Sequence, residues 1–321
     1  MNVKKTKLIN FIFDKYFLLK TLTSSFTIPK KHKIPQFITV FSIFFVIFSP
    51  ENLQNIVSGL GILSFGILHG ANDLKILSSK KLQKSSFIGI PFLPIYIGVV
   101  LLGIMIFYFI PGIALLTFVM VSCYHFGEQH WNDKLDNFNN PLLFYTSYGA
   151  TIFLLLFSFH ITEVKNVIYE ISSVNIPIQF FLFSLLIIGF ISIIFMLYVI
   201  KNFNLFLIEL MLLGTLTILF WKSSLLFGFG LYFVLWHSLP SLKSQIKYLY
   251  GPEEESPYSK YLKSAFLYWI LALIGLMTSY FYGSLPKDQY LSIFFSFLAA
   301  ITFPHVIVMG IMFHSHKNDS N

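Results

Sequence analysis

Long apolar stretches separated by short polar breaks dominate the chain. A helix needs about 20 mostly apolar residues to cross the hydrocarbon core of a bilayer. The apolar stretches 35–48, 112–126 and 225–239 are short for this, so eight or nine spans also fit the pattern. The pattern predicts an all-α, polytopic bundle of about ten transmembrane helices. The expected spans are 35–48, 53–70, 87–110, 112–126, 141–159, 177–200, 205–221, 225–239, 264–282 and 291–313.

Lysine positions predict how these spans are oriented. Basic residues concentrate in the cytoplasmic loops of membrane proteins. If the spans alternate, the opposite side receives little basic charge, namely Lys165, Lys222 and Lys287, beside acids such as Glu51 and Glu163. We therefore expect both termini in the cytoplasm and a multi-pass protein of the inner, cytoplasmic membrane. The lysines on the predicted cytoplasmic side include Lys30, Lys31, Lys33, Lys75, Lys80, Lys81, Lys84, Lys201, Lys243, Lys247, Lys260, Lys263 and Lys317.

The composition agrees with a membrane protein and excludes several kinds of site. Of the 321 residues, 56% are hydrophobic and only 11% are charged, against about 25% charged in soluble domains. The single cysteine, Cys123, excludes an intrachain disulfide and leaves nitrogen or oxygen to bind any metal. The net charge of +8 comes from lysine, without arginine, and is better explained by membrane orientation than by nucleic-acid binding.

Three parts of the chain are expected from this pattern. Residues 1–33 form a basic N-terminal segment that lies at the membrane interface. Residues 34–313 form the transmembrane domain that carries the chemistry, and residues 314–321 form a polar tail.

Histidines gather at the ends of the spans that are predicted to run inward. His69 ends the second span, His125 and His130 end the fourth, His237 ends the eighth and His305 lies in the last. Taken singly, each is more simply an interfacial residue or a helix cap. We call these four histidine-bearing sites, in chain order, the four histidine islands. Their position at one depth indicates a shared site, because polar residues inside a membrane usually mark function.

A metal is the chemistry that such a cluster favours. Imidazole suits zinc, copper, iron or nickel, so the ligand type alone does not choose among them. A metal-bound histidine commonly donates its other ring N–H to a carboxylate. Asp73 lies four residues after His69, and Glu128 lies three residues after His125. Both acids are therefore candidates to orient those rings, or they are solvated acids at helix ends.

Four motifs in this order resemble a known family. They are GxxHGxxD from Gly66 to Asp73, the run His125-Phe126-Gly127 before Trp131, WHSL around His237, and Pro304-His305 in the last span. This order is similar to that of the Brp/Blh family, membrane-bound β-carotene 15,15'-dioxygenases of bacteria and archaea. The resemblance extends from the second span to the last.

The resemblance implies an activity and a cofactor. Family members cleave β-carotene at its central double bond with dioxygen, which yields two retinal molecules, at ferrous iron held by histidines. His69, His125 and His237 match family iron ligands. The family has another histidine four residues after the third, where this chain has Ser241. His305 is the first choice for the fourth ligand and His130 the alternative; a three-histidine site or a changed activity also remains open.

Two rival hypotheses come from other classes of protein. A transporter or an accessory factor of retinal biogenesis would use its histidines structurally or as proton relays, but only Glu209 lies as an acid within a span. A diiron desaturase would need HxxxH and HxxHH boxes, which the sequence lacks. For the carotenoid-cleaving hypothesis we expect the apolar substrate to enter sideways from the bilayer, and the 39 phenylalanines and 17 tyrosines to line its path in part.

Overall fold

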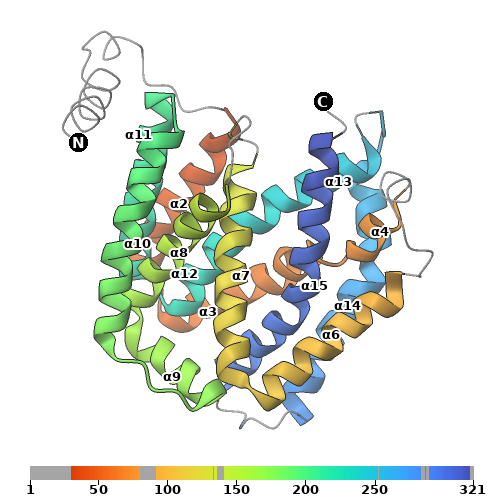
Figure 1. Cartoon of the computed structure of the whole chain (residues 1–321), viewed down its shortest axis with the longest axis horizontal. Coiled ribbons are helices and arrows are strands. Elements are labelled where there is room, and N and C mark those ends of the chain that lie inside the picture. The colour runs from red at the N-terminus through yellow and green to blue at the C-terminus, as the bar shows by residue number, and fades with distance from the viewer. Residues whose placement is uncertain are drawn as a thin grey trace, which may run out of the picture.

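The computed structural model describes residues 30–79, 92–132, 134–135, 141–251, 253–282, 286 and 289–318. Every regular element in these ranges is a helix, which confirms the all-α expectation (Figure 1). The expected N-terminal segment lies almost wholly outside the described residues, as do Lys80, Lys81 and Lys84. The elements are α2 (Lys30–Phe48), α3 (Glu51–Gly61), the π-helix η2 (Ile62–Gly66), α4 (Asp73–Leu77), α6 (Phe92–Phe109), α7 (Pro111–Trp131), α8 (Pro141–Phe159), α9 (Ile161–Ser172), α10 (Ile178–Val199), α11 (Phe203–Lys222), α12 (Leu225–Tyr232), the π-helix η3 (Phe233–Ser238), α13 (Leu239–Tyr250), α14 (Pro257–Tyr282) and α15 (Tyr290–Asn318).

Seven of the described helices are long and apolar enough to cross a membrane. They are α6, α8, α10, α11, the continuous helix Leu225–Tyr250, α14 and α15. The other three expected segments, 35–48, 53–70 and 112–126, are helical too, but their helices are shorter or more polar. The chain is a multi-pass membrane protein. Its ten spans and the cytoplasmic position of its termini stay predictions.

The two ends of the described bundle lie on one side of it. Figure 1 shows the start of α2 and the end of α15 on the same side, with α9 on the opposite side. An even number of crossings produces such an arrangement. The amphipathic helix α9 was not among the expected elements. It follows His160, whose Nε2 lies 2.9 Å from the carbonyl oxygen of Phe220. The residue that caps its C-terminus, Ser173, is in the left-handed conformation, with φ of 57°.

Helices α7 and α8 pack with their backbones almost in contact. A Cβ atom at Gly127 would collide with the carbonyl oxygen of Tyr145, and one at Gly149 would collide with that of Cys123. Small residues allow such approaches between membrane helices, where close van der Waals packing drives association. This contact fixes how α7 is rotated, and therefore where the side chains at its buried end point.

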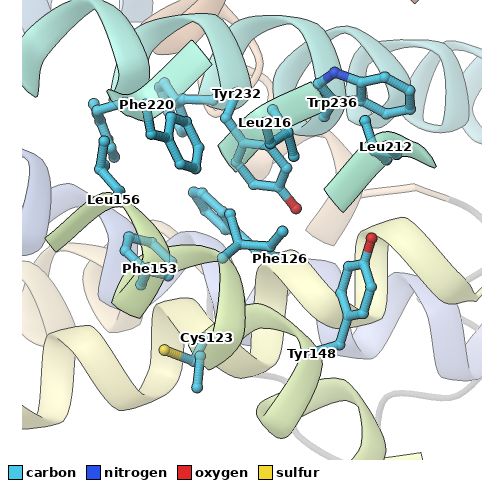
Figure 2. Close-up of a cluster of buried hydrophobic side chains, with 14 of the residues drawn as sticks. Cys123, Phe126, Tyr148, Phe153, Leu156, Leu212, Leu216, Phe220, Tyr232 and Trp236 are labelled. Atoms are coloured by element: carbon cyan, nitrogen blue, oxygen red, sulfur yellow. The ribbon is translucent and has the colours of Figure 1, made fainter. Parts of the chain in front are cut away.

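The main core lies between α7, α8, α11, α12 and η3. Aromatic side chains dominate it, and Figure 2 shows the rings of Phe126, Phe153 and Tyr232 packed between these helices. The centroids of Phe126 and Phe153 are 5.2 Å apart, and those of Phe126 and Tyr232 are 6.0 Å apart. Trp236 closes one end of this core and donates a hydrogen bond from its indole to Thr39 of α2 at 3.0 Å. The residue after Trp236 is His237, so the core directly supports the histidine cluster.

Candidate metal centre

Two π-helices bring the first and third histidine islands together. η2 ends just before the turn that carries His69, and η3 contains His237. The wider π turn is rare and occurs mostly at functional sites, because its extra residue redirects side chains. A Cβ atom at Gly66 would lie 2.7 Å from the ring of Phe233, so only glycine lets η2 approach η3 this closely. The approach places the ring centroids of His69 and His237 5.1 Å apart.

Helices α7 and α15 supply the second and fourth islands. His125 lies in the buried last part of α7, and His305 lies in the middle of α15 after Pro304. The ring centroid of His125 is 4.8 Å from that of His237 and 5.3 Å from that of His305. His305 and His69 are 4.6 Å apart by the same measure. The structure therefore brings the four expected histidines together from four separate segments.

The geometry of this cluster suits a metal ion. One ring nitrogen from each of His69, His237 and His305 lies within 4.8 Å of the others. All three residues are at most 5% exposed, and His125 beside them is fully buried. No charged side chain is needed to hold such a cluster, because neutral imidazoles bind transition metals directly.

Several ring nitrogens in the cluster lack hydrogen-bond partners among the described residues. They are Nε2 of His69, both nitrogens of His125, Nδ1 of His237 and Nε2 of His305. Buried polar atoms nearly always have a partner, and each exception calls for an explanation such as an ion. Nδ1 of His69 donates to the carbonyl oxygen of Gly66, which leaves Nε2 as the lone-pair nitrogen. Each of the four rings therefore offers a metal at least one unpartnered nitrogen.

Asp73 orients His305, not the histidine nearest to it in sequence. Its carboxylate oxygens lie 2.9 and 3.1 Å from Nδ1 of His305, and Asp73 is only 1% exposed. Tyr96 of α6 donates to the same carboxylate at 3.1 Å. The spacing of the sequence had suggested His69 as the partner, but the chain turns at Gly70 and α4 begins only at Asp73. A carboxylate on Nδ1 leaves Nε2 of His305 as the lone-pair nitrogen.

A buried hydrogen-bond chain supports the turn at His69. Gln245 of α13 donates to the carbonyl oxygen of His69 at 2.7 Å and to the hydroxyl of Ser241 at 3.1 Å. Tyr261 of α14 donates to Gln245 at 2.7 Å. Ser241, a member of this series of hydrogen bonds, is fully buried. Ser241, where the resemblance implies a histidine, thus accepts a hydrogen bond from the glutamine that holds the backbone at His69.

The alternative ligand, His130, lies in a separate polar cluster. Helix α7 continues without a break to Trp131, so His130 and His125 point in different directions. Nε2 of His130 lies 2.8 Å from Glu209 of α11 and 2.7 Å from Nζ of Lys134. Lys134 also donates to Glu209 at 2.6 Å, and Tyr148 of α8 donates to it at 3.1 Å. Glu209, the acid that lies within a span, is therefore in a buried ion pair.

Glu128 makes its described hydrogen bond within α7. It accepts from the hydroxyl of Tyr124 at 2.7 Å, one turn earlier on the same helix. Both ring nitrogens of His125 are without a hydrogen-bond partner among the described residues, so that ring is not held by Glu128. Packing holds it instead, since it lies edge-on to His237 and Phe126.

Aromatic rings enclose the cluster on one side. Phe126 stacks on His237 with centroids 4.1 Å apart, and Phe233 lies parallel to His237 at 5.6 Å. A cavity of about 190 Å³ adjoins all four histidines. The rest of its lining is mostly apolar and includes Phe118, Phe153, Phe229, Tyr268, Ala272, Leu298 and Ile301.

The sequence did not identify several residues of this site. Tyr96 and Gln245 touch the histidines or their supports, yet they lie in stretches without a motif. Tyr96 has a weak signal, because it is a hydroxyl within a strongly apolar span. Gln245 has a similar one, because it lies two turns after His237 on the continuing helix. Neither signal indicates which histidine the residue serves.

Comparison with known proteins agrees with the geometry. The sequence model of the family described as beta-carotene 15,15'-dioxygenase matches residues 60–313, which include all four clustered histidines and both π-helices. A search of curated proteins found no match, and neither did a search of solved structures. The match covers most of the chain and begins within α3, close to where the resemblance in motifs begins. The chain therefore belongs to the β-carotene 15,15'-dioxygenase family.

Proposed function

We propose that the protein cleaves β-carotene at its central 15,15' double bond with dioxygen to give two molecules of retinal. One carbon–carbon double bond breaks, and each of its two carbons takes one atom of the dioxygen molecule as an aldehyde oxygen. The observation that carries this proposal is the buried cluster of four imidazoles with unpartnered nitrogens beside an apolar cavity. The family to which the chain belongs supports the same reaction.

The ion we propose is a single ferrous iron bound by His69, His125, His237 and His305. The donor set fits it, because four neutral imidazoles favour a divalent transition metal and leave room for a further ligand. Ferrous iron would supply the site with the ability to activate dioxygen. The carbonyl oxygen of Gly66 and the carboxylate of Asp73 hold two of the rings in the tautomer that presents Nε2.

The remaining residues position the substrate and keep water out. The stacked rings of Phe126 and Phe233 beside His237 provide a flat apolar wall along which a polyene chain can lie. Water is excluded because every ring of the cluster is nearly or fully buried. An active site without bulk water also protects reactive species from side reactions.

The rival hypothesis of a transporter or accessory factor has less support. A proton pathway would need acids that line a path through the bundle. Glu209 is instead held by Lys134 and His130, and it does not line the cavity at the histidines. We further propose that the protein lies in the inner membrane with both termini in the cytoplasm, as the lysine asymmetry predicts.

Expression in cells that make β-carotene tests the proposed reaction. The wild type should remove the yellow colour and produce retinal, measured by extraction and chromatography. His69→Ala should abolish both effects. His314→Ala is the matched control, because His314 is exposed near the end of α15, and it should behave as the wild type. Cells that express the wild type in their membranes and keep all their β-carotene would contradict the proposal.

A further inference from the structure

The cavity beside the histidines is too small to enclose a carotenoid completely. Its volume is about 190 Å³, whereas pockets that surround a drug-sized ligand measure roughly 300–1,000 Å³. β-carotene is a long hydrocarbon rod, and cleavage at its centre requires it to extend to both sides of the metal. At least one half of the substrate must therefore pass through an opening in the cavity wall.

The lining residues of α14 show where that opening lies. Tyr268 lines the cavity, yet it is 40% exposed on the outer surface of the bundle. Ala272 lies one turn further along on the same face of the helix and is half-buried. Most of α14 faces outward, since few residues of its apolar window are buried. Tyr268 and Ala272 therefore lie between the cavity and the lipid-facing surface.

Contacts hold α14 in place on both sides of Ala272. The indole of Trp269 donates to the carbonyl oxygen of Leu63 in η2 at 2.8 Å. Further along, a Cβ atom at Gly275 would lie 3.3 Å from the ring of Phe297, so α14 and α15 approach closely there. Between these contacts the small side chain of Ala272 leaves the space that a larger residue would fill.

The chemistry of the wall suits a hydrocarbon that arrives from lipid. Phe118 of α7 and Leu298 and Ile301 of α15 contribute to the apolar lining, as do the buried Phe153 and Phe229. A polar molecule from water would find few hydrogen-bond partners along this path. A carotenoid dissolved in the bilayer would exchange one apolar environment for another.

We propose that the carotenoid reaches the histidines sideways from the bilayer, through an opening edged by Tyr268 and Ala272, and that the size of the side chain at position 272 limits which substrates pass. This inference rests on the proposed function and names the access route and a residue that determines specificity. It leaves the metal ligands unchanged, so it can fail while the proposed reaction stands.

Substitution of Ala272 tests the inference directly. Ala272→Phe in the purified full chain should lower kcat/KM for β-carotene at least tenfold, mainly through KM, with iron content and thermal stability unchanged. Leu271→Phe is the matched control: it adds a ring at the next residue, which is 53% exposed and does not line the cavity. The control should stay within about twofold of the wild type. Equal effects of the two substitutions would overturn the inference.

Cysteine labelling in membranes provides a second test that needs no activity. The chain has one cysteine, Cys123, and it is buried, so the wild type should react little. We expect β-carotene to protect the thiol of Ala272→Cys from a lipid-soluble maleimide, and not to protect that of Leu271→Cys. Lack of protection at position 272, in a protein whose wild type cleaves β-carotene, refutes the access route alone. A wild type that cleaves no carotenoid refutes the proposed function, and protection is then still measurable.

Discussion

Replacing His305 by alanine should strip iron from the protein, whereas replacing His130 should not. His305→Ala removes a proposed ligand and leaves the buried carboxylate of Asp73 with one described hydrogen bond, from Tyr96. Loss of a residue that merely supports a ligand typically costs about 10–100-fold in metal affinity. Loss of the ligand itself should exceed that range. We therefore expect at least a 100-fold loss, or about 2.7 kcal/mol at about 1.36 kcal/mol per factor of ten.

The expected effect of His130→Ala is on stability. Without His130, Glu209 still accepts hydrogen bonds from Lys134 at 2.6 Å and from Tyr148 at 3.1 Å. The substitution therefore removes part of a buried network, which typically costs about 1–3 kcal/mol. Metal affinity should stay within about threefold of the wild type, because the described ring contacts of His130 are to Trp131, Tyr148 and Trp236.

Asp73→Asn provides an intermediate case. Its amide oxygen can still accept from Nδ1 of His305, but it lacks the negative charge that makes the bond strong. We expect a loss of affinity within the 10–100-fold range for supporting residues. The order of iron loss should therefore be His305→Ala, then Asp73→Asn, then His130→Ala.

Elemental analysis of purified protein measures this order, together with titration of the metal-free protein by Co²⁺, whose visible absorption reports ligation. Thermal unfolding of the metal-free variants separates loss of ligand from loss of fold. The wild type should hold about one iron per chain. The reverse order, with His130 essential and His305 dispensable, would assign the fourth ligand to α7. If both are dispensable the site has three histidines, and stoichiometric zinc or two irons would refute a mononuclear iron site.

Two further predictions concern the fold. Gly149→Ala should destabilise the protein by about 1–3 kcal/mol or more, because its Cβ would collide with the carbonyl oxygen of Cys123. Gly214→Ala is the control and should be neutral, since nothing lies within 4 Å of its Cβ. Thermal unfolding in detergent compares the two variants, and equal midpoints would contradict the packing. Reporter domains fused after Lys84 and Lys247 should read as cytoplasmic, and a periplasmic reading at either would refute the orientation expected from the lysines.

Apolar patterning predicted the helices well but could not settle how many cross the membrane. Each expected segment contains a helix, since a bilayer demands that backbone hydrogen bonds be satisfied internally. The difficulty lies in helices such as α7, whose last ten residues run from Ser122 to Trp131 and carry most of its polar side chains. The polar side chains of a functional site lower the mean hydropathy by which a span is recognised. A helix that carries such a site is therefore the hardest to identify as a span. The amphipathic helix α9 was not predicted for a related reason, because its apolar residues cover one face only.

The partners of the histidines could be predicted only where the chain is regular. The rule that residues four apart share a helix face suggested that Asp73 serves His69, but it applies only within a helix, and a turn separates the two. The true partner, His305, is 232 residues away, at a distance that no local pattern encodes. This pairing also bears on the serine at position 241, where the resemblance implies a histidine. Asp73 orients His305, and His305 offers the site a fourth nitrogen from the last helix instead. On the proposed ligand set, the GxxHGxxD motif thus serves two ligands at once, presenting His69 and orienting His305.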